Sequence, residues 1–124
     1  MDTIATNDAP KAIGPYSQAV RAGNLLFLSG QIPLDPAAGE LVQGDFAVQA
    51  RRVLENLKAV LAEAGATFAN VTRATVYLTD LGNFQTLNGI YAEYFGDHKP
   101  ARSTVGVASL PRGAAVEIDF IAVL

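Results

Sequence analysis

The chain has 124 residues, of which 50% are hydrophobic and 17% charged, and its formal net charge is −3. That length predicts one domain over residues 1–124. The chain contains no run of about eighteen apolar residues, which excludes a membrane-spanning helix. Its nine basic residues are spread among twelve acidic ones and do not form the basic stripe of a nucleic-acid-binding protein.

The small share of charged residues predicts self-association. Soluble domains average about 25% charged residues, so we expect this chain to bury part of its surface against copies of itself. Cysteine is absent, which excludes a disulfide framework, a thiolate nucleophile and a sulfur-based metal site. Residues 1–8 lack the basic start and apolar stretch of a signal peptide and are too acidic for a transit peptide, so we expect a cytoplasmic protein.

The first predicted unit is a β-hairpin. Residues 18–21 and the apolar run 25–30 are typical of strands, and Gly23-Asn24 between them is typical of a hairpin turn. The Pro, Asp and Gly content of residues 33–39 predicts a loop after the second strand.

A long helix is predicted over residues 46–64. Asp45 is its expected N-cap and Gly65 its C-terminal stop. The apolar residues recur at spacings of three and four, which gives one buried stripe. This stripe consists of Phe46, Ala50, Val53, Leu54, Leu57, Val60 and Leu61.

A strand and a second helix follow. In residues 71–79, apolar and polar side chains alternate, which is typical of a strand. Residues 84–95 predict a helix with Asn83 as its cap and Gly96 as its terminator. The expected inner face of this helix consists of Phe84, Leu87, Tyr91 and Tyr94.

Two further strands are predicted, over residues 103–108 and 115–123, and residues 110–113 join them as a hairpin. The element order is therefore β-β-α-β-α-β-β, with hairpins at both ends. This order favours an α+β fold, a two-layer sandwich of a mixed β-sheet with two helices on one face. The other face of the sheet needs cover, which again predicts an oligomer.

The last strand carries charged residues among apolar ones. Its even-numbered residues from Val116 to Ala122 point to one face and Glu117, Asp119 and Ile121 to the other. If the even face packs on the helices, Glu117 lies on the open face, with Arg102 as its nearest expected partner. Such a pair is either a structural ion pair at an interface or part of a site for a carboxylate-bearing substrate, and the spacing leaves both open.

Four blocks of the chain, in order along nearly its whole length, resemble the RidA/YjgF family of reactive intermediate deaminases. They are Ile13-Gly14-Pro15-Tyr16-Ser17-Gln18-Ala19, Ser29-Gly30-Gln31-Ile32-Pro33, Leu87-Asn88 with the following Tyr91 and Tyr94-Phe95, and Pro100-Ala101-Arg102 through Val116-Glu117-Ile118. The last block is the most specific. This family hydrolyses enamines and imines.

The resemblance implies a fold like that of chorismate mutase from bacilli, assembled as a homotrimer with three clefts between subunits. It implies small 2-enamino and 2-imino acids as substrates, notably 2-aminoacrylate and its imine tautomer. In the family, dehydratases that use pyridoxal phosphate release these compounds, and the products are a 2-keto acid and ammonia. Neither a cofactor nor a metal is required.

The resemblance also assigns roles to residues. Arg102 is expected to hold the substrate carboxylate in two hydrogen bonds, and Glu117 to position the attacking water and carry protons. Tyr16 is expected to close the pocket. From the residues alone, Tyr16 reads more readily as a core aromatic in a turn.

Four more positions belong to the expected site. Ser29 and Gly30 correspond to a small residue and an exposed backbone carbonyl of the family's pocket, although small residues there also serve packing or turns. Asn88 corresponds to an amide that lines the cleft; an Asn inside a helix indicates a specific hydrogen bond. Thr104 stands where many relatives have a cysteine and is expected to line the cleft.

Two other functional classes stay open. One is a ligand-binding or regulatory trimer that uses the same carboxylate clamp without turnover. The other is a ribonuclease or translation inhibitor. The acidic charge argues against the second, and so does His98, the only histidine. His98 lies in the predicted loop 97–100, where we expect it to be solvent-exposed, and a lone histidine also argues against a metal site.

Overall fold

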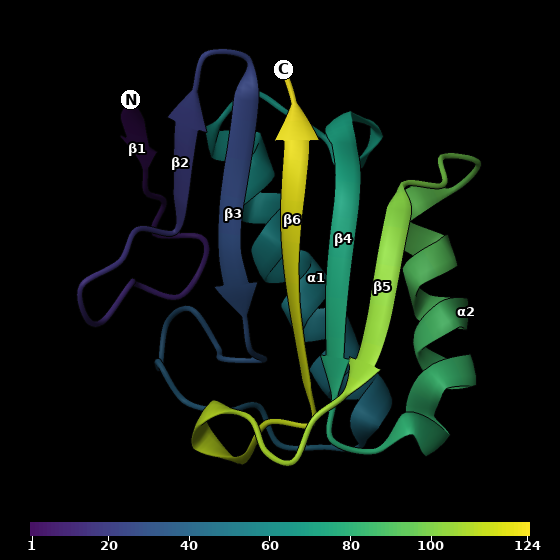
Figure 1. The fold of residues 1–124 in the computed structure, drawn as a ribbon. Coiled ribbons are helices and arrows are strands. Elements are labelled where there is room, and N and C mark those ends of the chain that lie inside the picture. The colour runs from purple at the N-terminus through teal and green to yellow at the C-terminus, as the bar shows by residue number, and fades with distance from the viewer.

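A computed structural model describes residues 1–124 as a six-stranded mixed sheet with two α-helices behind one of its faces (Figure 1). This is the predicted α+β architecture. Neither helix is long and apolar enough to cross a membrane. The elements are β1 Asp2–Ile4, β2 Ala19–Ala22, β3 Leu25–Gln31, α1 Phe46–Glu63, β4 Val71–Leu78, α2 Phe84–Phe95, β5 Ala101–Gly106 and β6 Val116–Val123, with 3₁₀ turns at Phe68–Asn70, Leu81–Asn83 and Pro111–Gly113.

The N-terminal hairpin of β2 and β3 is confirmed, and Gly23 supplies the positive φ of 63° at its turn. The prediction missed β1, which pairs antiparallel with β2 at the edge of the sheet. Its three residues are too few to show an alternating pattern, so only the contact with β2 defines it as a strand.

Helix α1 begins and ends as predicted. The Asp45 side chain accepts a hydrogen bond from the Val48 amide, and Gly65 has a φ of 76° just beyond the last turn. The predicted stripe faces the sheet: Phe46 is half-buried and the other six residues are fully buried. The stripe forms one core with the buried faces of β3, β4 and β6.

Helix α2 has the predicted bounds, but its cap and its buried face differ. Asn83 makes no capping hydrogen bond, because the 3₁₀ turn Leu81–Asn83 leads directly into the helix. Phe84 was expected inside and is 38% exposed. The helix packs on α1 and on the 3₁₀ turn at Phe68, which rotates the buried stripe to Leu87, Ile90, Tyr91 and Phe95.

The predicted C-terminal hairpin is wrong. Strand β5 pairs parallel with β4 as the edge strand, and β6 runs antiparallel between β3 and β4 (Figure 1). Helix α2 connects β4 to β5, and such a crossover joins parallel neighbours. Strand β6 buries four of its residues almost completely, at 0–1% exposure, which only a central position above the helices allows, whereas β5 has no fully buried residue.

Candidate functional site

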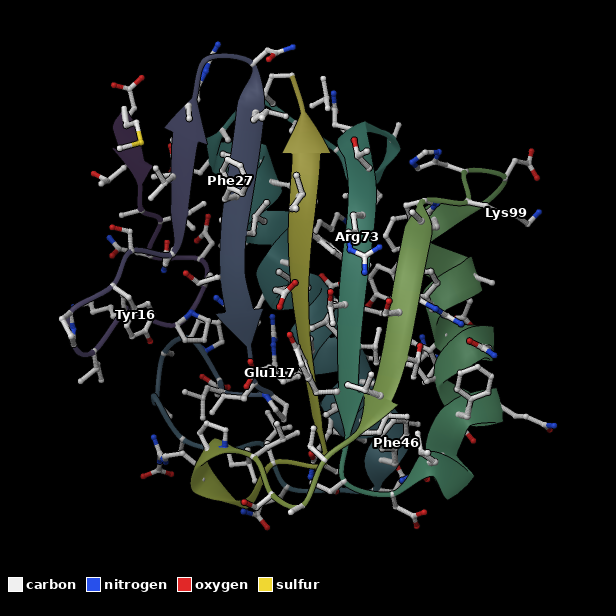
Figure 2. The ribbon with its side chains drawn as sticks, in the orientation of Figure 1. Tyr16, Phe27, Phe46, Arg73, Lys99 and Glu117 are labelled. Atoms are coloured by element: carbon white, nitrogen blue, oxygen red, sulfur yellow. The ribbon has the colours of Figure 1, made fainter.

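Glu117 lies on the open face of the sheet, as its alternation with buried neighbours predicts (Figure 2). It pairs across the sheet with Tyr77 of β4. On its other side, β3 has a bulge. Leu28 pairs with Phe120 and Gln31 with Ile118, so two β3 residues lie between these pairs where β6 has one. A bulge bends the strand and re-aims its backbone. Ser29 and Gly30 form this bulge beside the Glu117 carboxyl.

Gly30 makes room for the Glu117 side chain. A Cβ atom at position 30 would overlap Glu117 Oε2 and would lie 2.9 Å from Glu117 Cδ. Any other residue would therefore displace the carboxyl group. The absence of a side chain at Gly30 thus fixes where the Glu117 carboxyl can lie.

Glu117 is electrostatically poised for proton transfer. Burial raises the pKa of its carboxyl group above the ordinary value, and the charge of Asp119 raises it further. Glu117 makes no side-chain hydrogen bond within the chain, whereas Asp119 accepts one from the Tyr77 hydroxyl at 3.1 Å. A carboxyl group with a raised pKa and free oxygens is suited to accept and return a proton.

Tyr16 is exposed rather than packed in the core, with 54% of its surface accessible. It lies in the loop that precedes β2. In Figure 2 this loop is on one side of β3, and β6 with Glu117 is on the other side. Tyr16, Gly30 and Glu117 line one hollow of about 440 Å³, which we name the acidic hollow. Its other lining residues are Lys11, Ile13, Ile32, Leu34, Pro111 and Arg112.

Two cationic residues of the acidic hollow were not expected from the sequence. Lys11 and Arg112 come from loops on either side of it, and Arg112 has a φ of 61°, which non-glycine residues adopt only rarely. Its guanidinium donates to the Gly39 carbonyl oxygen at 3.1 Å. The turn Leu110-Pro111-Arg112-Gly113 was visible in the sequence, but nothing local placed it opposite Gly39.

Ser29 fixes the backbone around the acidic hollow. Its hydroxyl donates to the Ser17 carbonyl oxygen at 2.6 Å, and its amide donates to the Gln18 carbonyl oxygen at 3.0 Å. The hydroxyl is thus engaged next to Tyr16, and Ser29 does not line the hollow. Within the chain Ser29 has the packing role that the sequence left open.

Arg102 lies on the other face of the sheet from Glu117. Its partner in β4 is Ala74, which is buried beneath the helices. The guanidinium carbon lies 4.8 Å from the centre of the Tyr91 ring and 5.6 Å from that of Phe84. The one ion pair in the chain joins Arg51 and Glu93. Arg102 and Glu117 cannot form an ion pair within one chain, because they lie on opposite faces of the sheet and β5 does not pair with β6.

Arg102 and Asn88 line a second hollow of about 440 Å³, which we name the arginine hollow. Its other lining residues are Tyr91, Ala92, Phe95, Gly96, His98, Lys99 and Pro100. The Asn88 side-chain oxygen is buried and has no hydrogen-bond partner, so the bond expected for it is not made within the chain. No side-chain nitrogen or oxygen of Asn88 is hydrogen-bonded in the folded chain, which leaves this amide free for a ligand or a second subunit.

Thr104 and His98 differ from expectation. Thr104 lines neither hollow, and its hydroxyl is buried without a partner because the residue points to the helix side of β5, in register with Val76. His98 is half-buried, with Nε2 2.6 Å from the Val71 carbonyl oxygen. No group of three or more His, Asp or Glu side chains is placed to hold a metal ion.

Comparisons with known proteins agree along the whole chain. A family model described as Endoribonuclease L-PSP matches residues 6–124. Protein DfrA of Myxococcus xanthus is 62% identical over 122 residues, which cover 97% of this chain and 93% of that protein. The 2-iminobutanoate/2-iminopropanoate deaminase of Mus musculus is 49% identical over 120 residues, which cover 97% of this chain and 89% of the deaminase. The crystal structure of E. coli TdcF with bound serine has a TM-score of 0.95 at 44% identity and covers 100% of this chain and 99% of TdcF.

Replacing Gly30 by alanine should abolish most of any catalytic activity that depends on Glu117, while it leaves the fold intact. The new methyl group displaces the end of a flexible side chain, so the free energy of unfolding changes little, but the Glu117 carboxyl is moved from its place. The turnover rate and urea unfolding of Gly30→Ala check this. Gly89→Ala is the matched control, since a Cβ there meets no atom within 4 Å. Full activity in Gly30→Ala would show that the position of Glu117 is irrelevant.

Replacing Asp119 by asparagine should shift to lower pH the limb of the pH–rate profile that the ionisation of Glu117 sets. The negative charge of Asp119 raises the pKa of Glu117, and its removal lowers that pKa, while burial, the larger cause, remains. The pH dependence of kcat/KM reports this ionisation in the free protein. Glu63→Gln, which removes an exposed carboxylate at the end of α1, should leave the limb in place. A shift to higher pH in Asp119→Asn would contradict the assignment of the limb to Glu117.

Proposed function

Because the chain belongs to the RidA/YjgF/L-PSP family, we propose that it hydrolyses reactive 2-enamino and 2-imino acids to 2-keto acids and ammonia. One observation carries the proposal: Arg102 and Glu117 are both partly buried and neither makes a hydrogen bond within the chain. Groups of this kind are costly unless a ligand uses them. A guanidinium that takes a carboxylate and a carboxyl that carries protons are together what hydrolysis of a small imino acid requires.

The relatives support the substrate class. The mouse protein is named for 2-iminobutanoate and 2-iminopropanoate, and TdcF holds serine, which has the carboxylate and nitrogen of a 2-amino acid. We therefore propose compounds such as 2-aminoacrylate and 2-iminopropanoate as substrates here. Dehydratases that use pyridoxal phosphate produce such compounds, and the proposal places the chain beside them in the cytoplasm.

The acidic and arginine hollows form one site only if two subunits meet. We propose a homotrimer in which Arg102 of one subunit faces Glu117 and Tyr16 of the next. Two observations support this: the two residues lie on opposite faces of one sheet, and the open face exposes large apolar side chains. These are Leu25, Phe27, Val105 and Val123, each 38–43% exposed. Such a surface is typical of a subunit interface.

The proposed reaction follows from the chemistry of these groups. Arg102 binds the substrate carboxylate in two hydrogen bonds. For an enamine, protonated Glu117 gives its proton to the terminal carbon and produces the protonated imine. The Glu117 carboxylate then takes a proton from water as the oxygen attacks the imine carbon, and passes this proton to the nitrogen. As the adduct collapses and releases ammonia, the Glu117 carboxylate takes the proton of the new hydroxyl group, which leaves the ketone and restores protonated Glu117.

Modest catalysis is enough for this reaction. Imine hydrolysis is already fast in water, so one charged contact and acid–base help of a few kcal/mol suffice. The steps transfer only protons and water, and the proposal assigns them no cofactor. The Gly30 carbonyl, beside Glu117, is the proposed acceptor for the substrate nitrogen, which favours the protonated and more electrophilic imine.

The family description names a second activity, endoribonuclease. The net charge of −3 opposes binding to a polyanion. A mechanism with two histidines is not available, because His98 is alone and its Nε2 contacts the Val71 carbonyl oxygen. We therefore place imine hydrolysis first.

The protein should accelerate ammonia and keto-acid release from 2-aminoacrylate generated by a serine dehydratase. In Arg102→Ala, kcat/KM should fall by about 10- to 100-fold, because the charged hydrogen bonds to the carboxylate are lost. The kcat/KM of Arg102→Lys should lie between those of the wild type and Arg102→Ala, since lysine keeps the positive charge and loses the planar fork. Arg21→Ala, at an exposed position of β2, is the control. No acceleration by the wild-type protein would reject the deaminase and favour a regulatory trimer.

Two inactive variants should restore activity when they are mixed. Arg102→Ala and Glu117→Gln subunits, unfolded together in equal amounts and refolded, should regain about a quarter of the wild-type activity per site, since that fraction of cyclic interfaces carries both intact residues. Each variant refolded alone is the control. If the mixture is no more active than its components, both residues act from the same subunit and the shared site is wrong. Light scattering on the same samples measures the oligomeric state.

A further inference from the structure

The Arg102 guanidinium rests against aromatic rings. Its carbon lies 4.8 Å from the Tyr91 ring centre and 5.6 Å from the Phe84 ring centre. Phe84 and Tyr91 are seven residues apart in α2, which is close to two helical turns, so both point from one side of the helix. The two rings lie beside the Arg102 side chain where it leaves β5. We name Phe84 and Tyr91 the aromatic cradle.

No acidic residue holds Arg102 in the chain. The charged neighbours that line its hollow are Lys99 and the titratable His98, and neither can pair with a guanidinium. An ion pair would occupy the planar N–H fork, which binds carboxylates in two hydrogen bonds. An aromatic face attracts the positive charge without accepting those N–H groups in ordinary hydrogen bonds. The cradle thus explains how Arg102 is fixed and still has its donors free.

Tyr91 is a rigid part of this cradle. It is 9% exposed, and its ring stacks on Phe95 with centres 4.4 Å apart. Its hydroxyl is buried and has no hydrogen-bond partner, although leaving such a group unpaired is costly. Burial raises the pKa of Tyr91 to about 12, while the charge of Arg102 opposes the rise, so the phenol stays neutral near pH 7. Its useful part is the ring.

We propose that Phe84 and Tyr91 are positioning residues, which hold the Arg102 guanidinium by cation–π contact and leave its N–H groups free for the substrate carboxylate. The inference rests on the proposed function, because it takes Arg102 as the clamp. It assigns no chemical step to either ring. Loss of a ring therefore weakens substrate binding and leaves the chemical step unchanged.

Steady-state kinetics with 2-aminoacrylate generated in place tests the ring against the hydroxyl. Tyr91→Leu should raise KM by about 10- to 30-fold and Phe84→Leu by about 2- to 5-fold, as expected for a buried and a more exposed cation–π contact, with kcat unchanged. Tyr91→Phe keeps the ring and should match the wild type. Tyr94→Leu makes the same change on α2 at a residue that contacts Glu55 rather than Arg102, and its KM should not change.

The outcomes separate the cradle from the hydroxyl and from simple loss of folding. A fall in kcat in Tyr91→Phe would overturn the proposal in favour of a catalytic hydroxyl. A wild-type KM in both single variants, Phe84→Leu and Tyr91→Leu, would also overturn the proposal. Phe84 is 38% exposed, so Phe84→Leu tests the cradle even where Tyr91→Leu does not fold.

NMR spectroscopy tests the cradle without turnover. Side-chain protons of Arg102, identified by their loss in Arg102→Lys, should be shifted upfield by the rings, and Tyr91→Leu should remove most of that shift. Unshifted Arg102 protons in the wild type would reject the cradle even in an active deaminase. Shifted protons in a protein without deaminase activity would reject the proposed function and leave the contact standing.

Discussion

The position of β6 between β3 and β4 is the constraint on which the rest of the structure depends. One face of β6 is almost fully buried above α1, and this burial of apolar surface is the main driving force for folding. With β6 in the centre, β5 is left at the edge of the sheet. Glu117 then lies between Tyr77 and the bulge of β3, while Arg102 lies against α2 on the opposite side. The same packing that stabilises the core thus separates the two charges.

Both charges are supported without being neutralised. Glu117 fills the space that Gly30 leaves open, and burial together with Asp119 raises its pKa. Arg102 is held by aromatic rings and makes no ion pair. In each case the protein fixes the position of a group and leaves its hydrogen-bonding atoms free. Native charges that serve only stability are usually paired when they are buried, so this arrangement favours a role in binding and proton transfer.

The proposed assembly accounts both for the exposed apolar side chains of the open sheet face and for the separation of Arg102 from Glu117. A face with exposed Phe27 and Val105 gains free energy when a second subunit covers it. The same contact would bring one subunit's acidic hollow to another subunit's arginine hollow. Folding and site formation would then be coupled, because the proposed oligomer would bury the apolar face and complete the site together. This coupling is consistent with the small share of charged residues in the chain.

The helices, most of the strands and the position of Glu117 on the open face could be predicted from the sequence alone, because these follow from local periodicity and from caps such as Asp45. The sequence also singled out Arg102 and Glu117 as candidate site residues, through their chemistry and their family blocks. Only the tertiary structure decided that β5 pairs with β4, that β1 joins the sheet and that Phe84 and Tyr91 face Arg102. These features depend on which segments pair across long distances in the chain. Total burial in the core selects that pairing, and no local pattern records it.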